Sequence, residues 1–473
     1  MPKLLGFDRV PIPGPHVRTL FGTLRRLVGF LDDPVGVVLS LREHGDVAAV
    51  VDQNPAIVCV FGPERVREVL TNPAVFHNPE DFFQGPKGSA RDKMRSMVVT
   101  SNGEKHRRNR RLMMPALQRS ALDAYAADIT QLTRELLERW TIGSVVAADE
   151  LCREIALCIA IKCFYGIDVQ DGARELGRTM AEFVHIITAP LNILLPLNVP
   201  GLPYHRGVQL GEQLAARMMS IVDEKLRRGG EQRDAMGLML AARDEDGQGL
   251  SPDEIVAVAV ELFIAGSDTT AMTMLWTLFL LDQHPQLLDA VQTEVHAVLG
   301  ERTPTPADLP RLPLLDAAIK EAMRVLPTAP VMFLRAAAED TTLGGKPIPK
   351  HANVLVSPIA AHHDPAIYTE PRKFDPQRWS NLQPPSYTYF PFGAGPRTCA
   401  GAAFATQSTR LSLAMILQRF RLRTVAGTRI DRLTRGNIMH PKLGLKMTVQ
   451  APNGPVAAAE PVQGNIRELV QLA

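Results

Sequence analysis

The sequence predicts a mainly α-helical fold with a minor β region. Three observations support this prediction: the pattern is helical from Ser120 to about Leu240, a very long apolar helix follows Ser251, and short β-rich runs occur early and in the last third. No internal repeat and no Ser- or Gly-rich linker divides the 473 residues. We therefore expect one domain over residues 1–473, with a core from about 11 to 450 and a surface tail at 451–473, where a core pattern is lacking.

Short strands are expected in two parts of the chain. The early part mixes β-rich runs at Val47–Val51 and Ile57–Phe61 with helices. The last third turns to short strands and proline-rich loops at Lys350–Ser357 and Pro371–Pro385, and a further helix follows Cys399. The 37 prolines exceed average usage, so we expect many short, stiff connections between elements.

The most distinctive element is the helix that follows Ser251. Ser251-Pro-Asp-Glu254 supplies an N-cap, a proline at the first helical position and a glutamate that completes a capping box. Gln283-His284-Pro285 ends the helix after Asp282. About 32 residues would extend roughly 48 Å, enough to cross a domain. Residues 255–281 are apolar on nearly every side, which predicts a central buried helix.

Composition and charge exclude several classes of protein. Hydrophobic residues make up 45% and charged residues 22%, as in soluble globular proteins and unlike disordered or collagenous chains. The net charge of +2 gives no chain-wide attraction to nucleic acid or anionic lipid. Five cysteines without a CxxC pair indicate neither a disulfide framework nor a zinc ribbon. The reduced cytoplasm is therefore the simplest location.

The sequence predicts no integral membrane segment. Residues 1–16 contain no apolar run long enough for a signal or an anchor, because charges and prolines interrupt it. The most lipophilic stretch, residues 186–202, contains Pro190, Pro196 and Pro200, so it cannot form one continuous spanning helix. It could still form a lipophilic loop.

The sharpest local feature is a glycine-rich loop, Phe392-Gly-Ala-Gly-Pro-Arg-Thr-Cys399-Ala-Gly401, that leads into a helical run from Ala402. A cysteine at a helix N-terminus meets free backbone N–H groups and the positive end of the dipole, which favour the thiolate. The flanking glycines let the backbone approach a flat ligand, and Arg397 adds a cation. These features suit a soft sulfur ligand to iron. The alternative is a buried cysteine beside an ordinary helix cap.

This loop matches the heme-binding pattern F-x-x-G-x-R-x-C-x-G and resembles that of the cytochrome P450 monooxygenases. The resemblance covers about Pro11 to Gln450, with four motifs in order, and is to soluble bacterial-type members. It implies a triangular helical prism with a long central helix over the heme. It also implies a b-type heme, with Cys399 as the thiolate ligand of the iron, and insertion of one oxygen atom from O2 into a C–H or C=C bond. Phe392, Gly393 and Gly401 would contact the heme.

The segment Ala265-Gly-Ser-Asp268-Thr269-Thr270 lies near the middle of the long helix. Gly266 costs about 1 kcal/mol relative to Ala in a helix interior, and small residues would leave space for a bound diatomic. Thr269 can bond back to the carbonyl of Ala265 and open the helix locally. Such polar residues are often solvated, but an apolar helix disfavours that interpretation. The segment resembles the family's oxygen-activation segment, which implies proton delivery by Asp268 and Thr269 and places Ala265 at the heme.

Glu321 and Arg324 share a helix face at spacing i, i+3 and can pair. In isolation this would be a surface salt bridge worth under about 1 kcal/mol. The resemblance adds a third member, Arg378 of Phe374-Asp-Pro-Gln-Arg-Trp379. We interpret the three as structural, holding the segment before the cysteine loop.

The densest positive run is Lys105-His-Arg-Arg-Asn-Arg-Arg111. A nucleic-acid patch is the generic interpretation, but the near-neutral net charge disfavours it. The resemblance instead places His106 and Arg110 at the heme propionates, together with Arg335 and Arg397, because buried carboxylates need cationic partners. His106 stands where the commonest pattern has tryptophan. The remaining arginines could dock an acidic electron-transfer partner.

By position, the resemblance suggests an almost wholly apolar set of substrate contacts, which predicts a lipophilic substrate such as a terpenoid, fatty acyl chain, steroid or polyketide-like macrocycle. Any one of these residues could equally pack in the core. Glu261, one turn before Ala265, could bind a substrate hydroxyl or amine, or turn toward a basic neighbour. The set comprises Val98, Val99, Ile187, Leu191, Glu261, Ala265, Ala329, Val331, Met332, Ile438 and Met439.

Three functions compete at this point. The first is an O2-dependent monooxygenase that receives electrons from a separate ferredoxin or flavodoxin-type donor, with no flavin on this chain. The second is a heme-thiolate enzyme that uses peroxide or rearranges its substrate; such members usually lack the acid–alcohol pair, so Asp268 and Thr269 favour the first. The third is a non-heme cysteine enzyme or a binding module. A nucleophilic cysteine needs a base partner, and no sequence signature proposes one.

Overall fold

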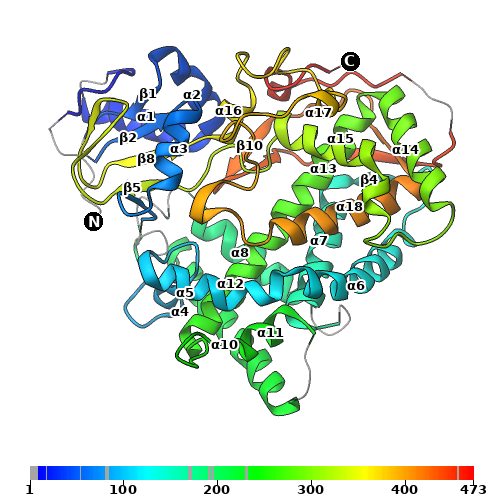
Figure 1. Ribbon diagram of the computed structural model, residues 1–473, viewed down its shortest axis with the longest axis horizontal. Helices are drawn as coiled ribbons and strands as arrows, with labels where there is room; N and C mark the ends of the chain where they lie inside the picture. Colours follow the sequence, from blue (N-terminus) through cyan, green and yellow to red (C-terminus); the bar gives the residue numbers. More distant parts are fainter. Residues whose placement is uncertain are drawn as a thin grey trace.

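Helices dominate the computed structural model, and a sheet-rich region occupies one corner of a triangular outline (Figure 1). The described residues are 9–16, 19–53, 55–79, 85–168, 173–189, 192, 196–229, 233–454 and 458–472. The helices are α1 Leu20–Asp32, α2 Pro34–Leu41, α3 Pro63–Thr71, α4 Ala90–Lys93, α5 Gly103–Met113, α6 Arg119–Leu137, α7 Ala148–Tyr165, α8 Ala173–Thr188, α10 Pro203–Arg228, α11 Ala235–Ala241, α12 Pro252–Gly266, α13 Asp268–Asp282, α14 Pro285–Leu299, α15 Pro313–Val325, α16 Pro358–His362, α17 Arg378–Asn381 and α18 Ala402–Arg419.

In the described part of the chain the strands are short and form four small sheets. They are β1 Val47–Val51, β2 Ile57–Val60, β3 Phe76–His77, β4 Val145–Ala147, β5 Arg335–Ala337, β6 Thr341–Leu343, β7 Lys346–Ile348, β8 Asn353–Val356, β9 Arg421–Thr424, β10 Arg432–Arg435, β11 Ile438–Pro441 and β12 Lys446–Gln450. The prediction of a mainly α fold with a minor β region is therefore confirmed.

The largest sheet joins the early strands to the last third of the chain. Its order is β1-β2-β8-β5-β3, and β2 runs parallel to β8 with Ile57 opposite Asn353. Most residues of β1, β2 and β8 are buried, because this sheet has hydrophobic clusters on both faces. β5, which carries Arg335, belongs to the same sheet and pairs antiparallel with β8.

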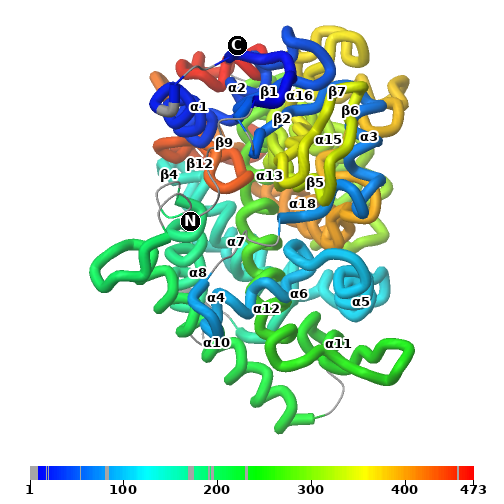
Figure 2. Tube along the Cα trace, turned by 90° about the vertical axis from the view of Figure 1, so that its left-hand side faces the viewer, coloured from blue at the N-terminus to red at the C-terminus, as the bar shows by residue number. Residues whose placement is uncertain are grey.

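The predicted central helix is present but interrupted at one residue. α12 and α13 follow each other through the middle of the molecule (Figure 2). The predicted capping box at Ser251 and Glu254 is confirmed. At Ser267 the backbone leaves regular helical geometry, and the Ser267 hydroxyl donates to the carbonyl oxygen of Phe263 at 3.0 Å. The sequence predicts a helix to Asp282 that opens locally at Thr269, and the structure has the interruption at Ser267, where side-chain hydroxyls bond main-chain carbonyls.

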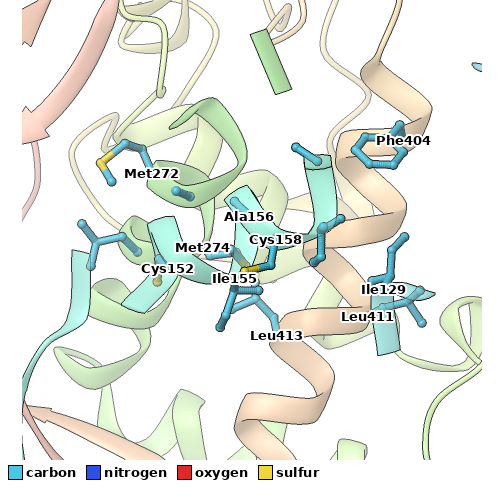
Figure 3. Close-up of a cluster of buried hydrophobic side chains, with 14 of the residues drawn as sticks. Ile129, Cys152, Ile155, Ala156, Cys158, Met272, Met274, Phe404, Leu411 and Leu413 are labelled. Atoms are coloured by element: carbon cyan, nitrogen blue, oxygen red, sulfur yellow. The ribbon is translucent and has the colours of Figure 1, made fainter. Parts of the chain in front are cut away.

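The hydrophobic core surrounds this broken helix. α13 packs on α7, and α18 packs on α6. Figure 3 shows apolar side chains from these helices gathered together, among them Cys152 and Cys158 of α7, Met274 of α13 and Phe404 of α18. Pro252–Asp282 has the length and hydropathy to span a membrane, but 61% of its most apolar window is buried inside the protein. Within the described residues it therefore has the packing of a core helix.

The end of the chain corrects one expectation. Residues 451–473 were predicted to form a surface tail, yet Val462, Ile466, Leu469 and Val470 are buried in the main core. Ile430 accounts for part of this, because its N–H donates to Gln463 and its carbonyl accepts from the N–H of Ile466. The apolar residues of this segment are too few and too irregularly spaced to show a core pattern in the sequence.

Candidate active site

Cys399 lies in a tight loop three residues before α18. Its backbone N–H donates to the carbonyl of Phe392 at 2.8 Å, and the N–H of Gly393 donates to Phe390 at 2.9 Å. Gly395 has a positive φ of 72°, and a Cβ there would lie 2.4 Å from the carbonyl oxygen of Leu70 in α3. This glycine is therefore required for the loop to pack against α3.

Opposing effects act on the Cys399 thiol. Desolvation by the surrounding atoms raises its pKa, whereas a hydrogen bond from the N–H of Gly401 and the charge of Arg110 act in the opposite direction. That the helix N-terminus favours the thiolate stays a prediction. A bound metal cation would reverse this balance.

Three arginines and a histidine from three segments converge near this loop. Burial, followed by the charges of Arg397, Arg110, Arg107 and Arg335, lowers the pKa of His106 to about 4. Burial also lowers the pKa of Arg335 to about 10, and burial with the nearby Arg335 and Arg110 lowers that of Arg397 to about 10. The structure thus brings together the four groups expected at the propionates: His106, Arg110, Arg335 and Arg397.

No carboxylate among the described residues forms an ion pair with this cation cluster, and Glu261 acts on Arg397 and Arg110 only through its charge. Arg397 donates to the carbonyl of Val98 at 3.3 Å and to Oδ1 of Asn102 at 2.7 Å, and Arg335 donates to the carbonyl of Phe333 at 3.2 Å. Buried cations are costly unless an anion accompanies them. The cluster therefore fits a ligand that brings its own carboxylates, as heme does.

Thr269 and Gly266, at the interruption between α12 and α13, differ in their surroundings. The Thr269 hydroxyl donates to the carbonyl oxygen of Ala265 at 2.6 Å, as predicted, and Ala265 is exposed although much of α12 is buried. A Cβ on Gly266 would lie 2.6 Å from the ring of Phe164 in α7. Gly266 therefore packs against Phe164. The space left by its missing side chain is taken by that ring and does not hold a diatomic molecule.

Asp268 takes part in an ion-pair network that the sequence did not reveal. Its carboxylate lies 3.2 Å from Nε of Arg153 in α7 and 3.3 Å from Nε2 of His440 in β11. Arg153 also pairs with Asp149 at 2.7 Å. Burial lowers the pKa of His440 against the opposing effect of Asp268. Asp268 and Thr269 thus hydrogen bond to different partners, and no local spacing signals Arg153 or His440.

The three residues of the E-x-x-R motif form a buried ion-pair cluster. Glu321 and Arg324 pair at 2.8 Å with both side chains fully buried, and Arg378 pairs with Glu321 at 3.3 Å. The indole N–H of Trp379 donates to Glu321 at 3.0 Å. Arg324 also donates to main-chain carbonyls of His362, Pro371 and Lys373. Sequence analysis missed Trp379, although it directly follows Arg378 in the quoted motif.

Glu261 binds the segment before α5 and not a basic neighbour. Its two carboxylate oxygens accept from the backbone N–H groups of Val98 at 2.6 Å and Val99 at 2.8 Å. Burial raises the pKa of Glu261 to about 7, while these two hydrogen bonds and Arg397 act in the opposite direction. The carboxylate that was expected to meet a cation or the substrate is therefore engaged with the main chain.

The apolar residues assigned to the substrate differ in their surroundings. Val98, Ile187 and Val331 are nearly buried, whereas Val99, Ala329, Met332 and Ile438 are half-buried. Met439 is fully buried in the core, so its side chain packs against protein. Leu191 lies outside the described residues.

The outer face of the basic run is neutralised by acids. Arg108 pairs with Asp244 at 2.7 Å and with Glu254 at 3.3 Å. Arg107 pairs with Glu104, and Arg111 pairs with Glu245. These pairs do not support the idea that the remaining arginines form a positive docking surface for an electron donor.

Comparison with known proteins agrees with this geometry. The family model described as Cytochrome P450 matches residues 12–449. Cyclooctat-9-en-7-ol 5-monooxygenase of Streptomyces melanosporofaciens is 33% identical, covering 84% of this chain and 86% of its own. Pentalenene oxygenase of Streptomyces avermitilis is 30% identical, covering 89% and 94%. The solved structure of retinoic acid bound cyanobacterial CYP120A1 has a TM-score of 0.81 at 23% identity, covering 94% of this chain and 100% of that one.

The chain belongs to the cytochrome P450 family, which confirms the resemblance. It is a monooxygenase, an oxidoreductase that acts on paired donors with O2. Membership implies a heme-thiolate cofactor, a lipophilic substrate and a redox partner. The Cys399 loop and the cation cluster are the parts of the described structure that fit such a cofactor.

Proposed function

We propose that this protein binds heme b and hydroxylates or epoxidises a lipophilic small molecule, with a terpenoid as the most specific class. The relatives named above act on cyclooctat-9-en-7-ol and pentalenene by their names. The largely apolar set around Val99, Ala265 and Ala329 supports a substrate of this kind. The overall change is R–H + O2 + 2 e⁻ + 2 H⁺ → R–OH + H2O, with electrons supplied by a separate ferredoxin or flavodoxin-type protein in the cytoplasm.

In this proposal the residues of the loop and the cation cluster hold the cofactor. Cys399 is the iron ligand, and the N–H of Gly401 donates a hydrogen bond to its sulfur, which moderates electron donation. His106, Arg110, Arg335 and Arg397 neutralise the two propionates, while Phe392, Gly393 and Ala265 border the ring. When bound, the heme activates O2 for insertion of one oxygen atom. The protein supplies the ligand, the protons and the position of the substrate.

Protons are delivered by Asp268 and Thr269 in the same proposal. The Thr269 hydroxyl holds its proton toward the Ala265 carbonyl, and Asp268 is held by Arg153 and His440. Asp268 must therefore exchange its partners to pass a proton to Thr269 Oγ1. Asp268→Asn should lower the rate of product formation by roughly 10²-fold or more and leave the absorption spectrum unchanged.

The observation that carries the proposal is the convergence of His106 with Arg110, Arg335 and Arg397 beside the Cys399 loop, with no ion-paired carboxylate among the described residues. The decisive experiment is the absorption spectrum of the reduced protein under carbon monoxide. We expect a thiolate-ligated heme in the wild type and its loss in Cys399→Ala, whereas Cys163→Ala, a buried cysteine of α7, keeps it. A thiolate signature that survives Cys399→Ala would refute the proposal.

The source of the oxidant distinguishes the proposed function from the peroxide-dependent alternative. The proposal expects turnover with an electron donor and O2, and little or none with peroxide alone. The non-heme alternative lacks support, because the charged groups that act on the Cys399 thiol are Arg110 and Glu261 and include no histidine base. A colourless protein after supply of hemin would favour it instead.

A further inference from the structure

Arg91 of α4 is a buried cation whose Nε and Nη1 have no hydrogen-bond partner among the described residues. Its residue is 4% exposed, and both of these nitrogens are buried. Among the described residues it has no ion pair with a carboxylate. Its guanidinium lies 4.6 Å from the ring centroid of Tyr204. A cation–π contact is worth far less than the desolvation of a guanidinium, so within the described part of the chain the charge is uncompensated.

The surroundings of Arg91 are formed by α10, which packs against both α4 and α8. A Cβ on Gly207 of α10 would lie 3.9 Å from Nη1 of Arg91 and 2.8 Å from a methyl carbon of Ile186 in α8. α4, α8 and α10 lie side by side in the lower part of the molecule (Figure 1, Figure 2). Ile186 precedes Ile187, one of the proposed substrate contacts. Arg91 and Ile186 therefore both lie against Gly207 of α10.

The surrounding acids do not account for this arginine. Glu212 of α10 is close, but its Oε1 accepts from the N–H of Ala90 at 2.8 Å. Asp92 pairs with Arg95 instead. Arg91 is also absent from the groups that lower the pKa values of His106 and Arg397, so it does not belong to the cation cluster. The heme propionates therefore do not explain it.

We propose that Arg91 binds a carboxylate on the substrate, so that the substrate is a lipophilic carboxylic acid. This inference rests on the proposed function, because it names the polar end of the molecule that the monooxygenase oxidises. A guanidinium recognises a carboxylate by two parallel N–H···O bonds. One cation neutralises a carboxylate, whereas a phosphate carries up to two charges. The apolar body of the substrate would extend from Arg91 toward Val99 and Ala265.

The test compares acids with their methyl esters on the ferric holoenzyme. The probes are retinoic acid, dodecanoic acid and ent-kaurenoic acid, each with its ester, titrated by the shift in heme absorption on displacement of the iron-bound water. We expect at least one acid to bind roughly tenfold or more tightly than its ester. Arg91→Met should remove that preference and leave ester affinity within about twofold. Arg91→Gln serves as the second variant if Met disturbs folding.

The matched control is Arg95→Met, which removes an exposed arginine two helical positions beyond α4 that pairs with Asp92 at 3.1 Å. It should keep the preference for acids. The inference is overturned if no acid binds more tightly than its ester, or if the preference survives both Arg91 variants. Failure of the proposed function is distinguishable, because it would appear as a missing thiolate–heme spectrum before any ligand is added.

Discussion

Two buried clusters of charge in this protein contrast in how they are satisfied. In the first, Glu321 accepts from Arg324, Arg378, Trp379 and the N–H of Asp375, so every charge has a partner from the chain. In the second, His106, Arg110, Arg335 and Arg397 gather without an ion pair to a carboxylate among the described residues. Both clusters lie on or beside the segment that leads to Cys399.

The difference separates structural charge from charge that serves a ligand. A cluster that the chain neutralises by itself gains nothing from a ligand, and breaking it leaves a buried ion without a partner. A cluster of like charges destabilises the protein until an anion arrives, and the anion is then bound tightly. Arg91 belongs to the second kind, as a single unpaired cation.

The largest effect is expected from breaking the saturated cluster. Glu321→Ala leaves two arginines without their carboxylate, and we expect a loss of about 3–5 kcal/mol in the free energy of unfolding. Urea denaturation of the holoenzyme measures this loss. Glu104→Ala, at an exposed pair, is the control and should unfold at the wild-type urea concentration. If Glu321→Ala lowers the free energy of unfolding by less than about 1 kcal/mol, the cluster contributes no more than an ordinary surface ion pair.

A smaller effect is expected from a substitution in the cation cluster, and it should appear in heme retention and not in the free energy of unfolding. Arg335→Met removes one cation that faces two others, so resistance to urea without heme should be unchanged or higher. Heme retention should fall by roughly tenfold, because one charge-assisted contact to a propionate is lost. The rate of heme transfer to an excess of a scavenger protein measures this change. Loss of stability with unchanged heme retention would contradict the distinction between the two clusters.

Glu261 provides a pH-dependent test at the border of the cation cluster. Its pKa is raised from 4.5 to about 7 by burial, so the folded protein holds this proton more tightly than the unfolded chain does. The associated stability is fully present below pH 4.5 and is lost as pH rises through about 7, by at most about 3 kcal/mol. Glu261→Gln should flatten the stability profile over this interval. An unchanged slope would show that other groups set the pH dependence.

The smallest effect is expected on the outer face of α5. Arg107 and Glu104 form an exposed pair, which water and salt screen effectively. Arg107→Ala should therefore change neither the melting temperature nor heme retention, and the contrast with Arg335→Met compares an exposed, paired arginine of α5 with a buried arginine of β5. A clear loss of electron transfer from a donor protein in Arg107→Ala would restore the docking role that the ion pairs disfavour.

Residue type and local spacing were enough to predict much of the site. The cysteine loop, the i, i+3 pair of Glu321 with Arg324, and the capping box at Ser251 each depend on residues close in sequence, and all have the expected geometry. The bond from Thr269 to the Ala265 carbonyl belongs to the same class, because it spans one helical turn. Such patterns are readable because helix geometry fixes which neighbours meet.

The sequence by itself determined the family, the mainly helical fold and the residues that converge at the cysteine loop. Only the tertiary structure decided the partners of Glu261 and Asp268, the contact of Gly266 with Phe164, the burial of the final segment and the isolation of Arg91. These features depend on which distant segments come into contact. Contacts between side chains that are 100 or more residues apart in the sequence depend on how the helices pack. No local sequence pattern encodes that packing.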